Sequence, residues 1–357
     1  MAFPFTLPPR YVYEGPKLPG GQGDVYVCRD TYLNRQVAIK VLVDSGDTVA
    51  LRKELTAIQS VRSRHVAQLY DTVRPPKGVG IGLVQEFVPG PTVKDYQSGS
   101  DPAHDFIRVL YQIACGIADI HKAGKIHRDI KPSNIRLDGE GVVKILDFGL
   151  TSKMGVDAVT IDARGTMCYL APELYVTAPI KLSPAIDIFA FGVTARVIAE
   201  GGAMLSVFRQ TPPYSTAFPS FSGCSLSLPT EVVALLDKTL SVSPSDRPLM
   251  SEIRDLLGRR LLYGKHRAVV TYGQMHELSK PGKSISLSIP GVGATAIKYD
   301  GLLFKIESVS GNVYINNRRA VVGEELPDSC VITIGAPVLG ASRTFAPFNV
   351  SHPGVVL

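Results

Sequence analysis

Cysteine is scarce in this chain, which has five cysteines among 357 residues. They lie far apart, at positions 28, 115, 168, 224 and 330, their number is odd, and no two form a CxxC pair. Disulfide frameworks and zinc modules use paired or closely spaced cysteines. The spacing argues against both kinds of site and favours a reducing compartment.

Long runs of one charge and long apolar runs are also missing. The net charge is +6, from 38 basic and 32 acidic residues. Basic side chains stand together only as pairs such as Arg259 with Arg260, so we expect no patch that binds nucleic acid or membrane. The apolar run at 186–198 contains Arg196 and is well short of the roughly 20 apolar residues that span a bilayer. It predicts a buried core helix.

The first ten residues lack the basic segment and apolar core that mark a signal peptide. Together with the cysteine usage, this favours a cytoplasmic location, and export by a route without a signal peptide stays open. Low-complexity tracts and internal repeats are absent as well. The length of 357 residues is enough for two or three hydrophobic cores.

What the chain does contain is a segment HRDIKPSN, followed by a segment ILDFG whose Asp147 lies thirteen positions after Asn134. Asp129 is predicted to accept or orient the proton of an attacking hydroxyl, and Lys131 to place positive charge near a moving phosphoryl group. Asn134 and Asp147 offer the hard oxygen ligands that Mg²⁺ prefers. Each residue alone is more often a turn former. Their order and spacing together predict phosphoryl transfer.

The upstream part of the chain supplies a glycine-rich turn and a strand with one lysine. Gly20, Gly21 and Gly23 open into an alternating apolar strand, so the backbone can close over phosphates without Cβ clashes. Lys40 lies in the run VAIKVL, and a strand buried on both faces rarely carries a charge without a partner. The candidate partner is Glu54, in a helix predicted over 49–61. The alternative is a solvated Glu and a Lys that extends along the strand end to water.

Residues 11–262 resemble the eukaryotic-type (Hanks-type) Ser/Thr protein kinases, in their bacterial form. The resemblance implies ATP-dependent phosphorylation of Ser or Thr hydroxyls on protein substrates, autophosphorylation, and a need for ATP and Mg²⁺. It rests on the glycine loop ending in Gly23-Asp24-Val25, Lys40 in VAIK, Glu54, Glu86-Phe87-Val88, HRDIKPSN, DFG, Ala171-Pro172-Glu173, Asp187 and Arg247.

The same resemblance implies roles for individual residues. Asn134 and Asp147 would hold the metal ion, the backbone of Glu86 and Val88 would contact adenine, and Val25 and Ala38 would roof it. The catalytic residues would be Asp129, Lys131, Lys40 and Glu54. The nucleotide site would consist of Leu18, Gly20, Gly21, Gly23, Val25, Ala38, Lys40, Glu86, Val88, Asn134 and Asp147.

Three further positions would shape the larger lobe: Glu173 would pair with Arg247, and Asp187 would begin a buried helix and brace the catalytic loop. The segment GTMCYLAPE resembles the peptide-binding ledge of the Ser/Thr branch, where Thr166 would bond near Asp129. Small-molecule phosphotransferases with the same core usually lack this ledge. The sequence therefore favours protein hydroxyls over those of a sugar, drug or lipid.

Other positions depart from the family pattern. Leu18 replaces the first loop glycine, with Pro19 beside it, and Arg136 stands where an aliphatic side chain usually floors the adenine. These departures support an alternative function, a pseudokinase scaffold that is weak or inactive as an enzyme and binds nucleotide or partners.

Regulation is expected to involve Arg128, because an Arg before the catalytic Asp usually requires a phosphorylated activation loop in the family. The usual phosphosite falls on Asp162, which is already anionic. We hypothesise that Asp162 pairs with Arg128 and makes loop phosphorylation unnecessary. Thr160 is an alternative phosphosite, and a solvated Asp162 is the alternative interpretation.

The kinase-like region predicts an α+β, bilobal protein-kinase fold, with a small β-rich N-lobe over 1–88 and a large helical C-lobe over 89–262. Helical patterns run from Asp105 to Gly124 and from Glu231 to Leu240, the second with Thr230 as its cap.

The end of the chain predicts a linker over 263–282 and a small all-β sandwich over 283–357, with strand-like runs at 284–289, 303–306, 312–316 and 331–334. The segments PGVGATAIKYDG, GNVYINNRRAV and EELPDSCVITIG resemble a forkhead-associated (FHA) domain, which binds phosphothreonine. Where that family presents Ser, Arg and His, this chain has Gly293, Ala294 and Thr295 or Ala296. We expect a degenerate FHA-like module that docks a protein partner, with an unrelated sandwich as the alternative.

Overall fold

The structure is a computed structural model. It describes residues 3–4, 6–18, 24–42, 61–74, 81–96, 98–146, 152–153, 155–156, 167–175, 181–212, 214 and 217–353. The chain divides into two compact units, 1–257 and 258–356.

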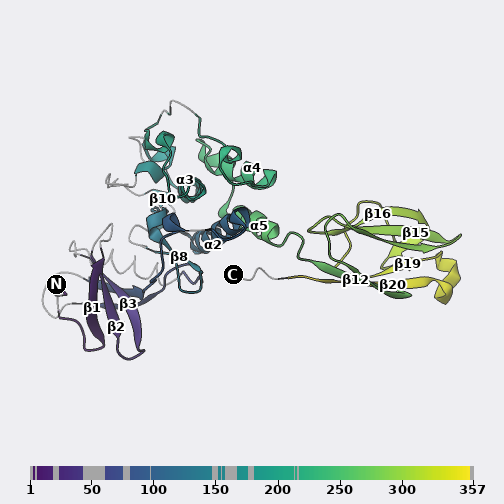
Figure 1. The fold of residues 1–357 in the computed structure, drawn as a ribbon, viewed down its shortest axis with the longest axis horizontal. Helices are drawn as coiled ribbons and strands as arrows, with labels where there is room; N and C mark the ends of the chain where they lie inside the picture. The colour runs from purple at the N-terminus through teal and green to yellow at the C-terminus, as the bar shows by residue number, and fades with distance from the viewer. Residues whose placement is uncertain are drawn as a thin grey trace. The chain divides into compact units, whose positions relative to one another are not determined.

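The first unit begins with an antiparallel sheet whose strand order is β1-β2-β3-β5-β4. Figure 1 labels its first three strands. Its buried face carries Cys28, Val37, Ile39 and Val84, all fully buried. Those on β3 are two positions apart, as expected when side chains alternate between the faces of a strand. The strands are β1 (Tyr11–Leu18), β2 (Val25–Asp30), β3 (Arg35–Leu42), β4 (Leu69–Val73) and β5 (Ile81–Glu86).

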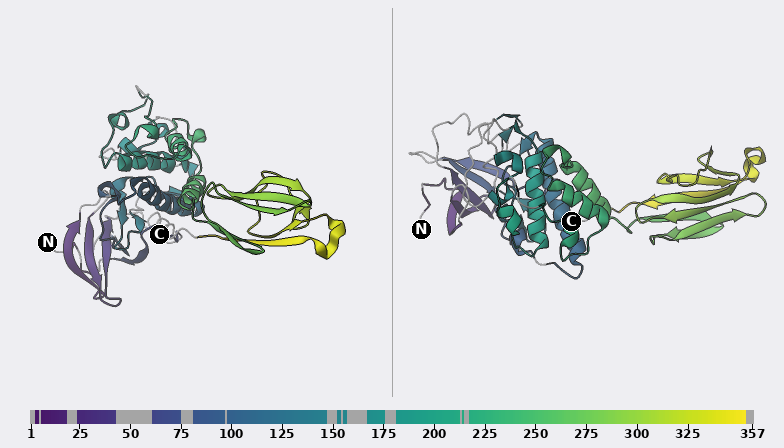
Figure 2. Two further views of the ribbon diagram at one scale, coloured as in Figure 1. Left: turned by 45° about the vertical axis from the view of Figure 1, so that its right-hand side comes forward. Right: turned by 90° about the horizontal axis from the view of Figure 1, so that it is seen from above.

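The rest of this unit is mainly helical (Figure 2), with short strand pairs and 3-10 turns between the helices. Its helices are α2 (Pro102–Lys122), α3 (Ala185–Ala199), α4 (Thr230–Thr239) and α5 (Met250–Leu261). The short strands form the pairs β6 (Lys125–Ile126) with β9 (Ser152–Lys153), β7 (Ile135–Leu137) with β8 (Val143–Ile145), and β10 (Gly155–Val156) with β11 (Lys181–Leu182). The 3-10 turns are η1 (Val93–Asp95), η2 (Pro132–Asn134), η4 (Met167–Tyr169), η5 (Pro172–Tyr175), η6 (Ser206–Arg209), η7 (Phe221–Gly223) and η8 (Pro244–Asp246).

Helix α2 has clear start and stop signals. The Asp101 carboxylate accepts a hydrogen bond from the His104 N–H at 3.1 Å, which satisfies one of the free donors at the N-terminus. Pro102 occupies the first turn, where its missing N–H costs nothing. Beyond the last turn Gly124 has φ +70°, a conformation that favours glycine. The chain is thereby turned toward the catalytic loop.

Helix α3 is apolar on almost all sides and contacts both α2 and α4. The predicted core helix over 186–198 is therefore confirmed, because its residues are buried by neighbouring helices of the same unit. Among the described residues, no helix has both the length and the apolar character needed to cross a membrane.

Helix α4 differs from the prediction at its start. Thr230 is the first helical residue, and the N-cap position belongs to Pro229, which makes no side-chain cap. The extended backbone of Pro229, with φ −59° and ψ 143°, sets the boundary one residue earlier than expected. The cap predicted at Thr230 is wrong, although the helix itself is confirmed.

The second unit consists of two antiparallel sheets that share one hydrophobic core. Strands β13-β12-β20-β19-β17-β18 form one sheet and β14-β15-β16 the other. Fully buried residues of both sheets meet in the core, among them Val270 and Phe348 from the first and Leu287 and Ile297 from the second. The strands are β12 (Arg267–Tyr272), β13 (Gln274–Leu278), β14 (Ser284–Ile289), β15 (Gly293–Tyr299), β16 (Phe304–Gly311), β17 (Val313–Ile315), β18 (Arg318–Arg319), β19 (Ser329–Ile334) and β20 (Thr344–Ser351), with a 3-10 turn η9 (Pro337–Ser342).

The four strand-like runs predicted in this region coincide with β14, β16, β17 and β19. The stretch 263–282, expected as a linker, contains β12 and β13 instead. A two-residue turn joins β17 to β18, where Asn316 and Asn317 have φ +47° and +65°. Two successive positive φ values are typical of the tight hairpin turns that asparagine tolerates.

A buried histidine is expected to make the stability of this unit depend on pH. His266 is 7% exposed, and its Nδ1 lies 3.2 Å from the Tyr299 hydroxyl, which donates to the Gly301 carbonyl. Burial, followed by the charge of His352, lowers the pKa of His266, while the carboxylates of Asp300 and Asp328 oppose the shift.

The unfolded chain takes up this proton near pH 6.5, but the folded unit resists it. We therefore expect the free energy of unfolding of this unit to fall as the pH drops below about 6.5. Denaturant unfolding of the protein between about pH 5 and 8 measures the slope. In His266→Asn the slope should be shallower, and an unchanged slope would assign the pH dependence to other groups.

Candidate active site

The catalytic loop runs between β6 and β7 and is held by one buried carboxylate. Asp187, in the first turn of α3, accepts hydrogen bonds from the backbone N–H groups of His127 and Arg128, both at 2.8 Å. A third contact joins Asp187 Oδ2 to His121 Nε2 at 2.9 Å. Burial alone raises the pKa of the Asp187 carboxyl, but these hydrogen bonds outweigh it and hold the pKa below its usual value.

This arrangement confirms the predicted brace on the catalytic loop, and it explains a strained backbone. Arg128 has φ +72°, which is uncommon for a residue other than glycine. The bond from its own N–H to Asp187 keeps it in that conformation. His121 was not predicted as part of the site, because it lies on α2, 66 residues before Asp187 in the sequence.

Asp129 lies at the centre of a small polar group. Lys131 Nζ is 2.8 Å from Asp129 Oδ2. Asn134 Nδ2 donates to the same oxygen at 2.7 Å and to the Asp129 carbonyl at 2.9 Å. Asp129 Oδ1 is buried and has no hydrogen-bond partner among the described residues. A buried acceptor left open in this way is costly unless a ligand completes it, so the carboxylate is suited to accept a hydroxyl proton.

The same group can also take part in binding a cation. Within the described part of the chain, both side-chain hydrogen bonds of Asn134 use its Nδ2, which leaves the side-chain oxygen as a hard donor for Mg²⁺. The second predicted ligand, Asp147, lies outside the described residues. Among the residues that are described, no group of three or more His, Cys, Asp or Glu side chains could hold a metal ion.

A cavity of about 290 Å³ lies beside this polar group. Its walls combine β-strand residues of the N-terminal sheet with catalytic-loop residues, and the Lys40 side chain, only 2% exposed, is part of the wall. Asp129 is not in the wall, but Lys131 and Asn134, which both contact it, are. The predicted site residues that line the cavity are Leu18, Val25, Ala38, Lys40, Glu86, Val88, Lys131 and Asn134.

Four lining residues were not predicted as part of the site: Gln85, Phe87, Ser133 and Leu146. Arg136, which was predicted at the floor of the adenine, also lines the cavity. Phe87 lies within the segment Glu86-Phe87-Val88 and Ser133 within HRDIKPSN, so their position in the sequence was a usable signal. Gln85 faces Ala38 across the β3–β5 ladder, and that register is visible only in the structure.

Several predicted residues cannot be placed. Gly20, Gly21, Gly23, Glu54 and Asp147 lie outside the described residues, and so do Thr160, Asp162 and Thr166 of the activation region. The Lys40–Glu54 pair, the closure of the glycine loop and the Asp162–Arg128 pair therefore stay predictions.

The structure confirms the predicted ion pair between Arg247 and Glu173, the last residue of the peptide-binding ledge. Arg247 donates to both carboxylate oxygens of Glu173, at 2.7 and 2.8 Å, and the Arg247 side chain is fully buried. Its remaining N–H groups donate to the carbonyls of Ala185, Ser241 and Val242. This bidentate geometry ties the ledge to the start of α3.

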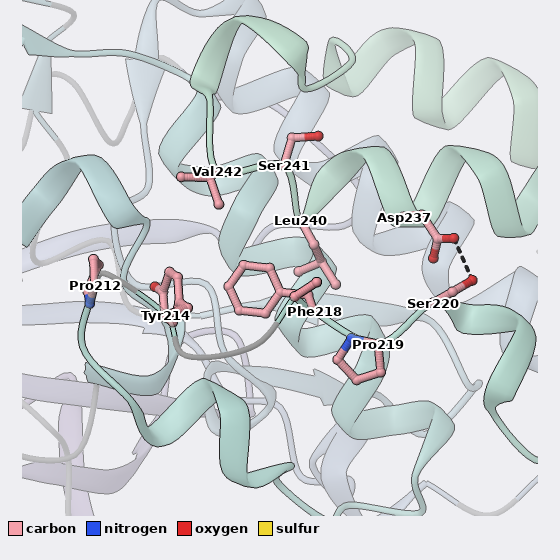
Figure 3. Close-up of a pocket in the computed structure, with 10 residues that line it drawn as sticks. Pro212, Tyr214, Phe218, Pro219, Ser220, Asp237, Leu240, Ser241 and Val242 are labelled. Carbon is pink, nitrogen blue, oxygen red and sulfur yellow. Dashed lines mark hydrogen bonds between the residues drawn. The ribbon is translucent and has the colours of Figure 1, made fainter.

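A larger cavity of about 530 Å³ lies elsewhere in the first unit and is not suited to phosphoryl transfer. Figure 3 shows apolar side chains, including Phe218 and Leu240, around it, with Asp237 directed toward Ser220. The two carboxylate oxygens of Asp237 already accept from Ser220 Oγ at 2.6 Å and from the Phe221 N–H at 2.8 Å. Among the described residues, the wall therefore offers no open carboxylate and no lysine or arginine for a phosphate.

Comparison with known proteins agrees with this geometry. The family model described as "Protein kinase domain" matches residues 19–256. The chain is 30% identical over 256 residues to serine/threonine-protein kinase PknL of Mycobacterium tuberculosis, which covers 68% of this chain and 63% of that protein. It is 29% identical over 243 residues to serine/threonine-protein kinase PrkC of Bacillus subtilis, covering 64% of this chain and 37% of that protein. The matches thus span less than two thirds of either relative.

Proposed function

This chain belongs to the protein kinase family, and from that premise we propose that it transfers the γ-phosphoryl group of ATP to Ser or Thr hydroxyls of protein substrates. The observation that carries the proposal is the buried Oδ1 of Asp129, which has no partner among the described residues. Asp129 contacts Lys131 and Asn134, and these two residues line a cavity together with Lys40. Acid, amide and cation are thereby grouped within reach of one bound ligand.

Each residue has a defined task in this proposal. Asp129 orients the substrate hydroxyl and accepts its proton through Oδ1. Lys131, held at 2.8 Å by the same carboxylate, places its charge where negative charge develops on the transferred group. Lys40 holds the phosphates of the nucleotide. A Mg²⁺ ion held by Asn134 and Asp147 would neutralise charge between the phosphate oxygens.

Protein rather than small-molecule substrates are supported by the ledge around Glu173. This segment forms η4 and η5 and is fixed through the Glu173–Arg247 pair. Both relatives described above, PknL and PrkC, are named serine/threonine-protein kinases, and HRDIKPSN is typical of that branch. Autophosphorylation belongs to the same proposal.

A second candidate function is a scaffold that binds nucleotide but transfers nothing. Arg136, in the wall of the cavity, favours it, because the family usually has an aliphatic residue there. The preserved contacts among Asp129, Lys131 and Asn134 argue against it, since a scaffold has no need of a positioned general base.

For the second unit we propose a degenerate FHA-like sandwich that docks a protein partner. The two sheets around one core support the sandwich. Thr295, at a position where the family presents a phosphate-binding group, is 2% exposed and donates its hydroxyl to the Ser308 carbonyl at 2.8 Å. Its hydroxyl is therefore engaged inside the protein, which supports the loss of phosphate binding.

The enzymatic proposal predicts phosphoryl transfer that depends on Asp147. Purified protein, Mg²⁺ and ATP labelled on its γ-phosphate should give phosphoserine and phosphothreonine on the chain itself or on a generic basic protein. On a good substrate the turnover should be on the order of 1 to 100 per second. Asp147→Ala should abolish the signal.

Two outcomes would count against the proposal. If the wild type binds ATP but transfers no label, the scaffold is the better account. If label reaches only tyrosine or a small molecule, the substrate class is wrong.

A further inference from the structure

Arg136 lies in β7 directly opposite Lys144 in β8. The alternate residues of this hairpin, Ile135 and Ile145 among them, are fully buried on the other face. Two like charges placed opposite each other in an antiparallel pair are normally destabilising. Their presence indicates that something on this face of the hairpin holds each of them separately.

The hinge, residues 86–90, supplies those partners. Lys144 Nζ lies 2.7 Å from Glu86 Oε1, with both side chains largely buried. The guanidinium of Arg136 donates to the carbonyls of Val88, at 3.3 Å, and Gly90, at 3.1 Å. Lys144 thus takes the carboxylate of the hinge, and Arg136 takes two neutral oxygens.

Within the described part of the chain, this division of partners leaves Arg136 with two backbone carbonyls and no carboxylate as hydrogen-bond partners. Its position is nevertheless fixed, because the hinge lies against β7. Leu137 N–H donates to the Pro91 carbonyl at 3.0 Å, and any side chain at Gly90 would collide with the carbonyl oxygen of Leu137. A planar cation is held in the wall of the nucleotide cavity.

The wall of the cavity also has an apolar part. Val25 and Ala38 of the N-terminal sheet line it, while the lysines of the site, Lys40 and Lys131, belong to strand β3 and the catalytic loop. A flat aromatic base can fit between an apolar roof and a guanidinium, and a guanidinium attracts the face of an aromatic ring more strongly than an aliphatic side chain does.

We propose that Arg136 is a specificity-determining residue of the base subsite, where its guanidinium, anchored by the Val88 and Gly90 carbonyls, packs against the adenine of the nucleotide. The inference rests on the proposed nucleotide-binding function and deepens it. Arg136 acts on the base and not on the phosphates, so it contributes equally to the binding of adenosine and of ATP.

Calorimetric titration of wild type, Arg136→Leu and Arg136→Lys with adenosine, MgATP and inorganic tripolyphosphate tests this role. Arg136→Leu should weaken the binding of adenosine and of MgATP by the same factor, about 3- to 30-fold, as expected for loss of a cation–π contact. Tripolyphosphate binding should be unchanged. Arg136→Lys keeps the charge but not the planar guanidinium. Its affinities for adenosine and MgATP should lie between those of the wild type and of Arg136→Leu.

Arg108→Leu, which removes a charge from α2 outside the cavity, is the matched control and should leave all three ligands unaffected. Thermal unfolding confirms that each variant is folded. Adenosine binding to Arg136→Leu that equals or exceeds the wild type would overturn the inference. So would a loss seen only with MgATP and tripolyphosphate, which would place the guanidinium at the phosphates.

The two levels of the proposal fail differently. If wild type binds neither adenosine nor MgATP, the nucleotide-binding function and the role of Arg136 are both wrong. If wild type binds both ligands and Arg136→Leu changes neither affinity, only the role of Arg136 is wrong.

Discussion

Asp129→Asn is expected to lower kcat by about 10²- to 10⁴-fold, the range that a positioned general base contributes. The amide has nearly the same shape as the carboxylate, so Lys131 and Asn134 can stay in place. It cannot accept the hydroxyl proton through the position of Oδ1, which is buried and has no partner in the described part of the chain. Steady-state kinetics with a Ser/Thr substrate measures the loss.

The separation of kcat from nucleotide affinity makes this prediction specific. Because Asp129 is not in the wall of the cavity, the affinity for MgATP should change little. Asp105→Asn on α2, which removes a carboxylate far from the loop in sequence, is the control and should keep wild-type kcat. A kcat for Asp129→Asn within about threefold of wild type would remove Asp129 from the chemistry.

The contribution of Lys131 to kcat should depend on the Asp129 carboxylate. Since Lys131 Nζ contacts Asp129 Oδ2 at 2.8 Å, the two side chains act as one group. The losses of Asp129→Asn and Lys131→Met should therefore be far from additive in the double variant.

Arg247→Met is expected to cost the first unit about 3–5 kcal/mol of unfolding free energy, the usual result of removing one partner from a buried ion pair. The Arg247 side chain is fully buried, and its loss leaves the Glu173 carboxylate and three backbone carbonyls without their donor. Methionine fills similar volume, so the cost arises mainly from the unpaired polar groups.

Denaturant unfolding, followed by a probe in the first unit, measures this cost. The matched control is Arg254→Met, because Arg254 pairs with Asp255 on the surface of α5, with the carboxylate side chain 61% exposed. Surface pairs contribute at most about 1 kcal/mol, so the control should unfold almost as the wild type does. Equal stability of the two variants would show that the Glu173–Arg247 pair does not hold the ledge.

The sequence predicted best those elements whose signal is local. The apolar run at 186–198 becomes α3 because it is too apolar to lie on a surface, and β14 follows its alternating pattern over Ser284–Ile289. Strand β12 alternates buried Ala268 and Val270 with more exposed residues, so its pattern was a usable signal that was missed. Strand β13 was missed for a physical reason. β13 is an edge strand of which only Leu278 is buried, so its other residues are polar or exposed and give no strand pattern.

In the candidate site, too, the sequence predicted local features and missed contacts between distant residues. Motif spacing located the loop with Asp129, Lys131 and Asn134, and the structure brings these three residues together. The contacts of Arg136 with the hinge were not predictable, because 46 and 48 positions separate the donor from its two acceptors. Only the tertiary pairing of the β7–β8 hairpin with the hinge brings them into contact.

A crystal structure with Mg²⁺ and a non-hydrolysable ATP analogue tests the central claim most directly. The account predicts the base in the cavity lined by Val25, Ala38 and Arg136, the phosphates beside Lys40, and the terminal phosphate directed toward Asp129. An analogue bound elsewhere, or phosphates far from Lys40 and Asp147, would contradict the claim that this cavity serves phosphoryl transfer.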